Sequence, residues 1–177
     1  MAATAAVSVP HIPVGEYLGS VYRPDVDYVD GVLEERNVGE FDHADIQFAI
    51  MQVLEGLRSE GFRSSMETRV QVSATRFRVP DVCLLPKGWK KTQIIREAPR
   101  LCVEVLSPRD TVMGMRRRCE DYLRMGVPEV WIVDPQARVV FVMNAGGFLE
   151  RSEGTLELQG VPLHLDIRSI FATLDVA

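Results

Sequence analysis

The stretch from Leu101 to Leu106, LCVEVL, constrains the fold more than any other part of the sequence. Its apolar residues are bulky or β-branched at successive positions, which is typical of a strand covered on both faces of its sheet. Glu104 interrupts this pattern with a carboxylate. A lone ionised carboxylate in a buried strand costs several kcal/mol unless a cation lies beside it. We therefore expect Glu104 either to reach water at the strand end, to pair with an arginine, or to bind a metal ion.

Strand-like segments recur along the chain on both sides of this run. The segment 27–37 contains the turn dipeptide Asp30-Gly31, which favours a strand pair or a bent strand. The tail from Gly146 is expected to form short strands and a last helical turn around 167–174. The remaining strands are expected at residues 67–73, 77–85, 100–106, 127–134 and 139–143.

Two segments have the periodicity of helices. The first is expected to be capped by Asp42 and to stop at Gly61, and the second covers about 110–125. The apolar row of the first helix consists of Ile46, Ala49, Ile50, Val53, Leu54 and Leu57. The order of elements predicts one α/β domain with a central mixed sheet over residues 16–177, preceded by an N-terminal arm at residues 1–15.

Length and composition limit the possible classes of protein. The 177 residues, 46% of them hydrophobic, suffice for one well-buried core and are few for two. A net charge of -5 argues against a protein that coats nucleic acid by charge alone, although a local basic cleft is compatible with it. Cys83, Cys102 and Cys119 are odd in number and lack CxxC spacing, so we expect reduced core thiols.

The location of the protein is also predicted by what the sequence lacks. The first residues have no basic segment followed by an apolar one, so we do not expect a signal peptide. No apolar run approaches the roughly 18 residues of a membrane span. We therefore expect a cytoplasmic protein without a membrane partner.

Two carboxylates fall on neighbouring predicted strands. Asp81 follows Pro80 at the start of one strand, and Glu104 lies on the next. If these strands pair, the two carboxylates converge at one end of the sheet and repel each other unless a cation lies between them. Hard oxygen ligands of this kind suit Mg²⁺ or Mn²⁺, and the backbone carbonyl of Val105 is a further candidate ligand.

The helix at about 110–125 carries three successive arginines. Arg118 flanks the apolar stripe and is the best placed to lean toward the sheet, where it could pair with Glu104 or Asp81. Arg116 and Arg117 are expected to turn away, into solvent or toward a phosphate. Tyr122, from the apolar stripe, is expected to pack in the core.

Other polar residues have a structural and a functional interpretation. Lys87, Lys90 and Lys91 lie in a basic loop that is either solvated or a flap over a ligand. His43, at a helix start, could activate water or touch a phosphate, but it could equally be a structural hydrogen-bonding group. One of Glu34 and Glu35 could point into the cleft, although exposed charges are the default on such a strand.

Several of these motifs together resemble the Uma-two family of restriction endonuclease-like proteins, within the PD-(D/E)XK phosphodiesterase superfamily. The resemblance covers roughly residues 16 to 170. It is carried by Asp30-Gly31, His43, Pro80-Asp81-Val82, Glu104-Val-Leu-Ser-Pro108, Tyr122 and Gly126-Val-Pro-Glu-Val-Trp131-Ile-Val-Asp134-Pro135. It implies a restriction-endonuclease-like mixed sheet flanked by helices, divalent-metal phosphodiester hydrolysis and a homodimer.

The sequence departs from the family pattern around the catalytic lysine. Position 106, where the superfamily has lysine, is Leu106, and the helical position to which this family moves the lysine is Arg118. Gly114 occupies a position that is often acidic in the family. Arginine can hold a phosphate through its planar fork, but its pKa is too high for it to accept a proton from water.

Two functional hypotheses follow. In the first, the protein is a Mg²⁺- or Mn²⁺-dependent endonuclease acting on nucleic acid, with DNA favoured. Its metal ligands would be Asp81, Glu104 and Val105, with Arg118 and His43 as further catalytic groups, and the nucleic-acid backbone would be steered by Lys87, Lys90, Lys91, Arg116 and Arg117. In the second, the protein is a catalytically inactive nucleic-acid-binding or dimeric interaction module, in which Arg118 neutralises the acidic pair.

Overall fold

The computed structural model of the chain describes residues 11–37 and 39–175. Its elements follow one another in the order α1 (Val14–Gly19), β1 (Val26–Val29), β2 (Val32–Glu35), α2 (Phe41–Glu55), η1 (Gly56–Glu60), β3 (Arg63–Met66), β4 (Val70–Ser73), β5 (Arg76–Arg78), β6 (Val82–Leu85), β7 (Leu101–Val105), α3 (Val112–Met125), β8 (Glu129–Asp134), β9 (Val139–Asn144), β10 (Gly147–Arg151), β11 (Thr155–Leu158), β12 (Val161–Asp166), α4 (Ile167–Phe171) and η2 (Ala172–Asp175).

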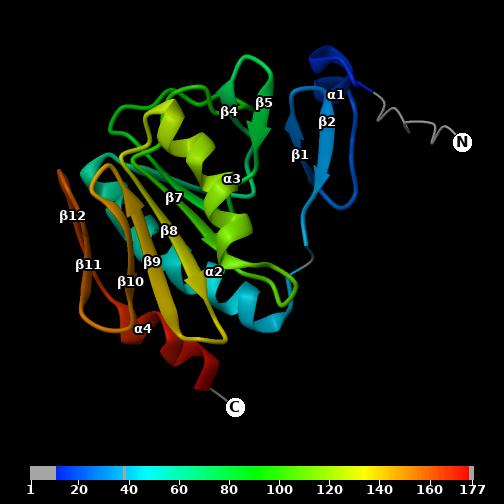
Figure 1. Ribbon diagram of the computed structural model, residues 1–177. Coiled ribbons are helices and arrows are strands. Elements are labelled where there is room, and N and C mark those ends of the chain that lie inside the picture. Colours follow the sequence, from blue (N-terminus) through cyan, green and yellow to red (C-terminus); the bar gives the residue numbers. More distant parts are fainter. Residues whose placement is uncertain (1–10, 38, 176–177) are drawn as a thin grey trace, which may run out of the picture.

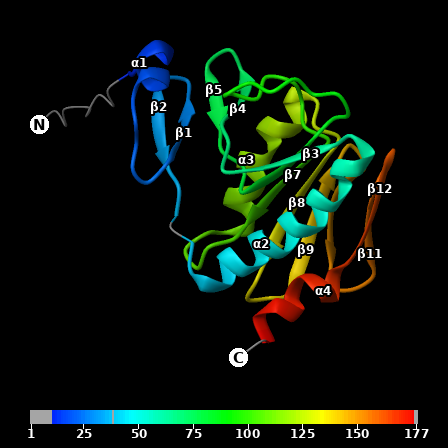
Figure 2. The ribbon, with the colours of Figure 1, turned by 180° about the vertical axis from the view of Figure 1, so that it is seen from behind.

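A six-stranded mixed sheet forms the centre of the fold, in the order β10-β9-β8-β7-β6-β3. Strands β7 and β8 are parallel, and their neighbours pair antiparallel. Helix α3 crosses over between β7 and β8 on one face, and α2 covers the opposite face (Figures 1 and 2). The predicted α/β fold with a central mixed sheet flanked by helices is therefore confirmed.

Strand β7 is the buried centre of this sheet, as its sequence predicts. Every residue from Leu101 to Val105 is buried. On the α2 side Val103 packs in one core cluster with Ile50, and on the α3 side Cys102 packs in a second cluster with Cys119. The two layers of helix explain why this strand has apolar residues at both alternating sets of positions.

A second, four-stranded sheet has the order β2-β1-β5-β4 and lies beside the first. The expected turn at Asp30-Gly31 joins β1 and β2 as a hairpin, with Gly31 in the left-handed region at a φ of 93°. The predicted strand 77–85 is wrong as one strand, because the chain leaves the second sheet after Arg78 and enters the first at Val82. Pro80 lies at this break, where its missing N–H costs no ladder hydrogen bond.

The first helix differs from its prediction at the cap and along one face. Helix α2 begins at Phe41 with Glu40 as N-cap, so Asp42 lies in the first turn, where its charge still favours the helix dipole. Val53 is 36% exposed, whereas Gln47 is buried. Gln47 is tolerated there because its side-chain amide donates a hydrogen bond of 3.0 Å to the backbone carbonyl of Asp81.

Other elements agree with the predictions or extend them. Helix α3 begins after Thr111, whose hydroxyl accepts a hydrogen bond from the backbone of Gly114, and the predicted last helical turn appears as α4 and η2. Strand β3 was not expected, because its sequence RSSM lacks the β-branched residues typical of strands. It forms as an edge strand paired with β6.

The predicted arm at residues 1–15 falls largely on residues 1–10, outside the described part of the chain. Within the described part, Ile12 donates a backbone hydrogen bond to Gly31, and Val14 opens α1. Both residues pack against a small cluster around Tyr17 and Tyr28. Among the described residues, no helix has the length and apolar character needed to span a bilayer.

Candidate active site

A cavity of about 200 Å³ opens where β6 begins and β7 ends. Its walls are formed by the segment after β2, the start of α2, the start of β6, the end of β7, and α3. It brings together all the predicted catalytic and metal-binding residues, and adds one arginine that was not predicted. Among the lining residues are Arg36, His43, Asp81, Glu104, Val105 and Arg118.

The sheet register explains why the two predicted carboxylates meet. Val82 of β6 pairs with Val103 of β7, so Asp81 and Glu104, each one position further, lie at the same level of the antiparallel pair. Both are buried, with 2% and 0% exposure. The backbone N–H of Val105 donates a hydrogen bond of 2.7 Å to Oδ2 of Asp81, which ties the two strand ends together.

Asp81 is held by cationic side chains from two other elements. Nη2 of Arg36 donates a hydrogen bond of 2.6 Å to its Oδ1, and Nε2 of His43 lies 3.6 Å from the same oxygen. Burial alone would raise the pKa of Asp81, but the contact with His43 and the charge of Arg36 hold it below its ordinary value. Asp81 is therefore ionised, and its charge also raises the pKa of His43 against the opposing effect of burial.

Glu104 has one satisfied and one unsatisfied carboxylate oxygen. The hydroxyl of Tyr122 donates a hydrogen bond of 2.6 Å to Oε1, and Nε of Arg118 lies 3.7 Å from that oxygen. Oε2 is buried and has no hydrogen-bond partner in the described part of the chain. Burial raises the pKa of Glu104 to about 7, although the charge of Arg118 opposes this shift and the charge of Asp81 reinforces it.

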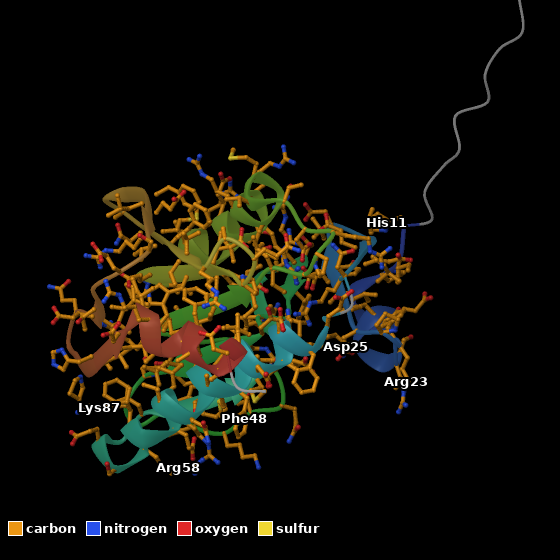
Figure 3. All side chains as sticks on the ribbon, turned by 90° about the horizontal axis from the view of Figure 1, so that it is seen from below. His11, Arg23, Asp25, Phe48, Arg58 and Lys87 are labelled. Atoms are coloured by element: carbon orange, nitrogen blue, oxygen red, sulfur yellow. The ribbon has the colours of Figure 1, made fainter. Side chains whose placement is uncertain are left out.

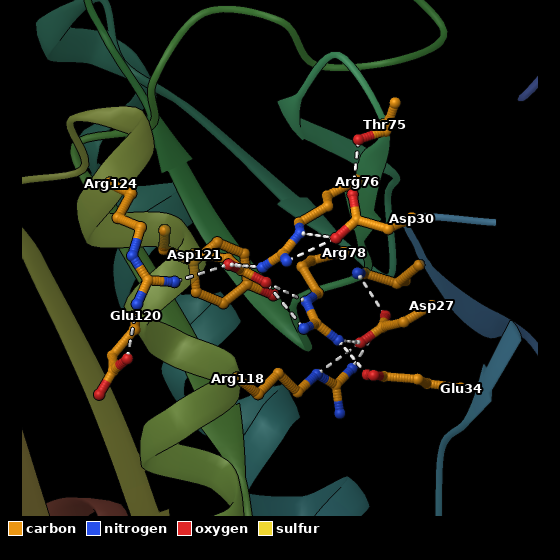
Figure 4. Close-up of polar contacts among 12 residues, drawn as sticks. Asp27, Asp30, Glu34, Thr75, Arg76, Arg78, Arg118, Glu120, Asp121 and Arg124 are labelled. Carbon is orange, nitrogen blue, oxygen red and sulfur yellow. Dashed lines mark hydrogen bonds and ion pairs between the residues drawn. The ribbon is translucent and has the colours of Figure 1, made fainter. Parts of the chain in front are cut away.

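Arg118 leans toward the sheet as predicted, but its shortest contact is with a residue that sequence reasoning missed. Its Nε lies 2.7 Å from Oδ2 of Asp27 on β1, and its Nη2 donates a hydrogen bond of 3.1 Å to Oδ1 of Asp27 (Figure 4). The expected ion pair of Arg118 with Glu104 is therefore present at 3.7 Å, but Asp27 is the closer partner of Arg118, and Asp81 is not among its ion-pair partners in the described residues. Arg118 pairs with Asp27 first and with Glu104 at longer range, and Asp81 pairs with Arg36.

A buried network of charged residues fixes this arrangement. Arg78 of β5 contacts Asp27 at 2.9 Å and Asp121 of α3 at 2.7 Å, so it joins the second sheet to the helix that carries Arg118 (Figure 4). Glu34 also contacts Arg78, at 2.5 Å. Of the two glutamates considered on β2, Glu34 thus binds a structural arginine and does not line the cavity around Asp81.

The residues that the prediction missed gave weak signals in the sequence. Asp27, Arg36 and Arg78 lie in short strands or just after them, where alternating charges usually indicate a solvent-facing side. Asp121 lies on a helix among other charged residues. Asp27, Arg78 and Asp121 are buried by the contact between the two sheets and α3, and no local pattern encodes that contact.

The predicted nucleic-acid-binding residues lie away from the cavity. Asp81 precedes β6 and Lys87 follows its other end, and Figure 3 shows Lys87 far from Asp25, a residue of the cavity wall. Neither Lys90 nor Lys91 lines the cavity. The structure therefore does not bring these lysines together with the two carboxylates.

The two other predicted phosphate contacts also face away from the cavity. The guanidinium of Arg116 stacks over the ring of Phe148 at 5.1 Å, and Arg117 is exposed on α3. Trp131 packs in the core as expected. A nucleic-acid contact of the basic residues stays a prediction.

The donor set of the cavity fits a hard divalent cation with few protein ligands. Asp81 and Glu104 supply carboxylate oxygens, and Oε2 of Glu104 is an unpartnered buried acceptor. Among residues 11–37 and 39–175, no group of three or more His, Cys, Asp or Glu residues is placed to hold a metal. Mg²⁺ is commonly bound by one or two carboxylates, with water and substrate phosphate completing its shell, so two carboxylates suffice.

The mixed sheet and its carboxylate pair place the protein in the restriction-endonuclease-like class. The family described as "Uma2: Putative restriction endonuclease" matches residues 19–175, and the chain belongs to this family. Comparison with curated proteins finds no match.

A solved structure shares the fold of the chain, and a second is matched more weakly. A crystal structure from Anabaena variabilis ATCC 29413, described as a "putative nuclease belonging to DUF820", is similar with a TM-score of 0.81 at 21% identity, over 92% of this chain and 99% of that one. A cryo-electron-microscopy structure of a DrdV–DNA complex is matched with a TM-score of 0.41 at 18% identity, over 73% of this chain and 10% of that one. The first of these structures shows that the two proteins share a fold.

Proposed function

We propose that the protein is a divalent-metal-dependent endonuclease that hydrolyses phosphodiester bonds of nucleic acid, with DNA as the substrate. One observation carries this proposal: the buried, unpartnered Oε2 of Glu104 lies in a cavity beside the ionised Asp81. A buried carboxylate oxygen without a partner is costly in a structural role, whereas a metal ion would satisfy it. Membership of a family described as restriction endonucleases supports the reaction class.

The ligands of the metal would be Asp81, Glu104 and the backbone carbonyl of Val105, and the ion would be Mg²⁺ or Mn²⁺. When bound, such an ion lowers the pKa of a coordinated water and neutralises charge on a phosphate. The chain's own part is to hold the two carboxylates in position. Tyr122 does this for Glu104, and the N–H of Val105 does it for Asp81.

Arg118 would stabilise negative charge on the substrate phosphate. Its guanidinium lines the cavity and is anchored by Asp27, so it presents a fixed positive charge without needing to reorganise. Arginine stays protonated, so it acts through charge and hydrogen bonding and does not remove a proton from water. His43 also lines the cavity and would contact the same phosphate.

The proposal extends to partners and location. Lys87, Lys90, Lys91, Arg116 and Arg117 would steer the nucleic-acid backbone from outside the cavity. A homodimer is proposed from the resemblance to the family. The three cysteines are free and buried, which supports a reducing location such as the cytoplasm.

Cleavage of plasmid DNA in Mg²⁺ tests the proposal. Glu104→Ala should abolish cleavage, because it removes the unpartnered acceptor that the metal would use. Glu153→Ala is the matched control, because Glu153 forms an exposed ion pair with Arg168. Full activity in the Glu104 variant would remove this residue from the reaction.

A second candidate function is a nuclease-fold module that binds nucleic acid or a second copy of the chain without catalysis. The observation that favours it is that arginines already pair with the acidic residues, Arg36 with Asp81 and Arg118 with Asp27. This alternative predicts DNA binding or dimerisation without any hydrolysis, and no gain of hydrolysis in Arg118→Lys. Metal-dependent cleavage by the wild-type protein would exclude it.

A further inference from the structure

Arg36 is the nearest cation to the carboxylate pair, although it comes from outside the central sheet. It follows β2 of the hairpin and reaches Oδ1 of Asp81 with its Nη2 at 2.6 Å. Its side chain is 14% exposed and lines the same cavity as Glu104 and Arg118. The guanidinium therefore occupies the side of Asp81 that faces the cavity.

The other oxygen of Asp81 also accepts a hydrogen bond. Oδ2 accepts the hydrogen bond from the backbone of Val105, which is part of the contact between β6 and β7. A metal ion that binds Asp81 through Oδ1 would have to compete with Arg36, which holds that oxygen. A guanidinium and a divalent cation repel each other, so the charge of Arg36 beside this oxygen weakens metal binding there.

Arg36 makes fewer hydrogen bonds than its guanidinium allows. Its Nε is buried and has no hydrogen-bond partner in the described residues, so the guanidinium is held through one end only. A planar fork with unused donors beside a cavity is suited to binding the oxygens of a phosphate. Arg36 lines the same cavity as the two carboxylates, so a guanidinium released from Asp81 would have its donors free for a phosphate bound there.

We propose that Arg36 alternates between two partners: Asp81 in the metal-free protein and a phosphate of the nucleic acid in the metal-bound protein. This inference rests on the proposed metal-dependent function and deepens it. Two consequences of opposite sign follow. Arg36 lowers the affinity of the site for the metal, and it raises the affinity of the metal-bound protein for nucleic acid.

Calorimetric titration with Mn²⁺ tests the first consequence. Arg36→Gln removes the competing charge and should bind Mn²⁺ about tenfold more tightly than wild type, the effect expected of one charge-assisted hydrogen bond. Arg168→Gln is the control for the same loss of charge, because Arg168 lies in an exposed ion pair with Glu153. The control should leave the Mn²⁺ affinity unchanged.

The affinity of each protein for duplex DNA, measured by fluorescence anisotropy in the presence of Ca²⁺, tests the second consequence. Arg36→Gln should bind the duplex several-fold more weakly, despite its tighter metal binding. Arg36→Lys keeps the charge beside Asp81 but lacks the planar fork, so it should keep the wild-type Mn²⁺ affinity and still bind DNA more weakly. A merely structural role for Arg36 would not change the two affinities in opposite directions.

The possible outcomes separate this inference from the proposed function. If Arg36→Gln binds Mn²⁺ no more tightly than the wild type does, the role of Arg36 is overturned. If Mn²⁺ binding by the wild type still depends on Glu104, the metal site itself is unaffected by that result. Unchanged or tighter DNA binding by both Arg36 variants overturns the phosphate contact. Absence of Mn²⁺ binding in the wild type and in both Arg36 variants contradicts the metal site itself.

Discussion

Arg118 and Asp27 form a two-point contact, with Nε 2.7 Å from Oδ2 and Nη2 3.1 Å from Oδ1. Arg118 comes from α3 and Asp27 from β1, so the pair connects the helix over the central sheet to the neighbouring hairpin. This contact accounts for an arginine at the position where the resemblance leads one to expect lysine. A planar fork can hold Asp27 and still present its charge 3.7 Å from Glu104, whereas a compact ammonium reaches fewer partners at once.

Removing Asp27 is expected to destabilise the fold. Asp27→Ala leaves Arg118 and Arg78 without their shared buried partner, and breaking a buried ion pair from one side typically costs about 3–5 kcal/mol. Urea denaturation of the variant and wild type measures the free energy of unfolding. Glu157→Ala, which removes the exposed partner of His164, should leave that free energy almost unchanged. An equal decrease in the free energy of unfolding of the two variants would contradict the assigned role of Asp27.

Removing the charge of Arg118 is expected to slow DNA cleavage by the folded protein. Arg118→Met keeps much of the side-chain volume and lacks the guanidinium. DNA cleavage should fall about 100-fold or more, the size of effect seen when one preorganised donor to a developing charge is lost. The rate should be measured with saturating Mg²⁺ at a temperature where circular dichroism shows the variant folded. An unchanged rate in the folded variant would remove Arg118 from catalysis.

The hydroxyl of Tyr122 is expected to tune the metal site without contacting the metal. Tyr122→Phe removes the 2.6 Å hydrogen bond to Glu104 and should lower Mn²⁺ affinity by about tenfold, because groups that orient a ligand typically contribute 10- to 100-fold. Tyr28→Phe removes a hydroxyl that donates to the carbonyl of Ile12, away from the cavity. Calorimetry should show an altered Mn²⁺ affinity only in the Tyr122 variant.

The three thiols are expected to be unreactive in the folded protein. Burial raises the pKa of Cys83 to about 12 and the pKa values of Cys102 and Cys119 well above their ordinary value. A raised thiol pKa means that the unreactive protonated form persists at pH 8, and burial also blocks access to the reagent. Ellman's reagent at pH 8 should detect almost no thiol in the native protein and three in denaturant. Rapid native reaction would show that the core opens easily.

The part of the fold that the sequence predicts well is the part governed by local patterns. The run Leu101–Val105 predicts a doubly covered strand, and the alternation of side chains predicts that Asp81 and Glu104 converge if their strands pair. The hairpin at Asp30-Gly31 is specified by a turn dipeptide. These features depend on near neighbours or on a simple two-residue period, so they can be read without knowing the tertiary structure.

The charge pairing around the candidate site could not be predicted in the same way. Asp27 and Arg78 are buried because a second sheet packs against α3, and Arg36 reaches Asp81 across 45 positions of the chain. The sequence does show that Glu104, if buried, needs a cation beside it. It does not show which arginine supplies the charge, because that choice depends on how the hairpin docks onto the central sheet.

Calorimetric titration of Mn²⁺ into the wild-type protein and Glu104→Gln shows whether Glu104 binds a metal ion. Glutamine keeps the shape of the side chain and can still accept a hydrogen bond from Tyr122, so loss of binding would reflect the missing carboxylate charge. We expect Mn²⁺ to bind the wild type, and the affinity to be lost or weakened at least about 100-fold in the variant. Equal Mn²⁺ affinity in the two proteins, or binding to neither, would contradict a metal site on Glu104.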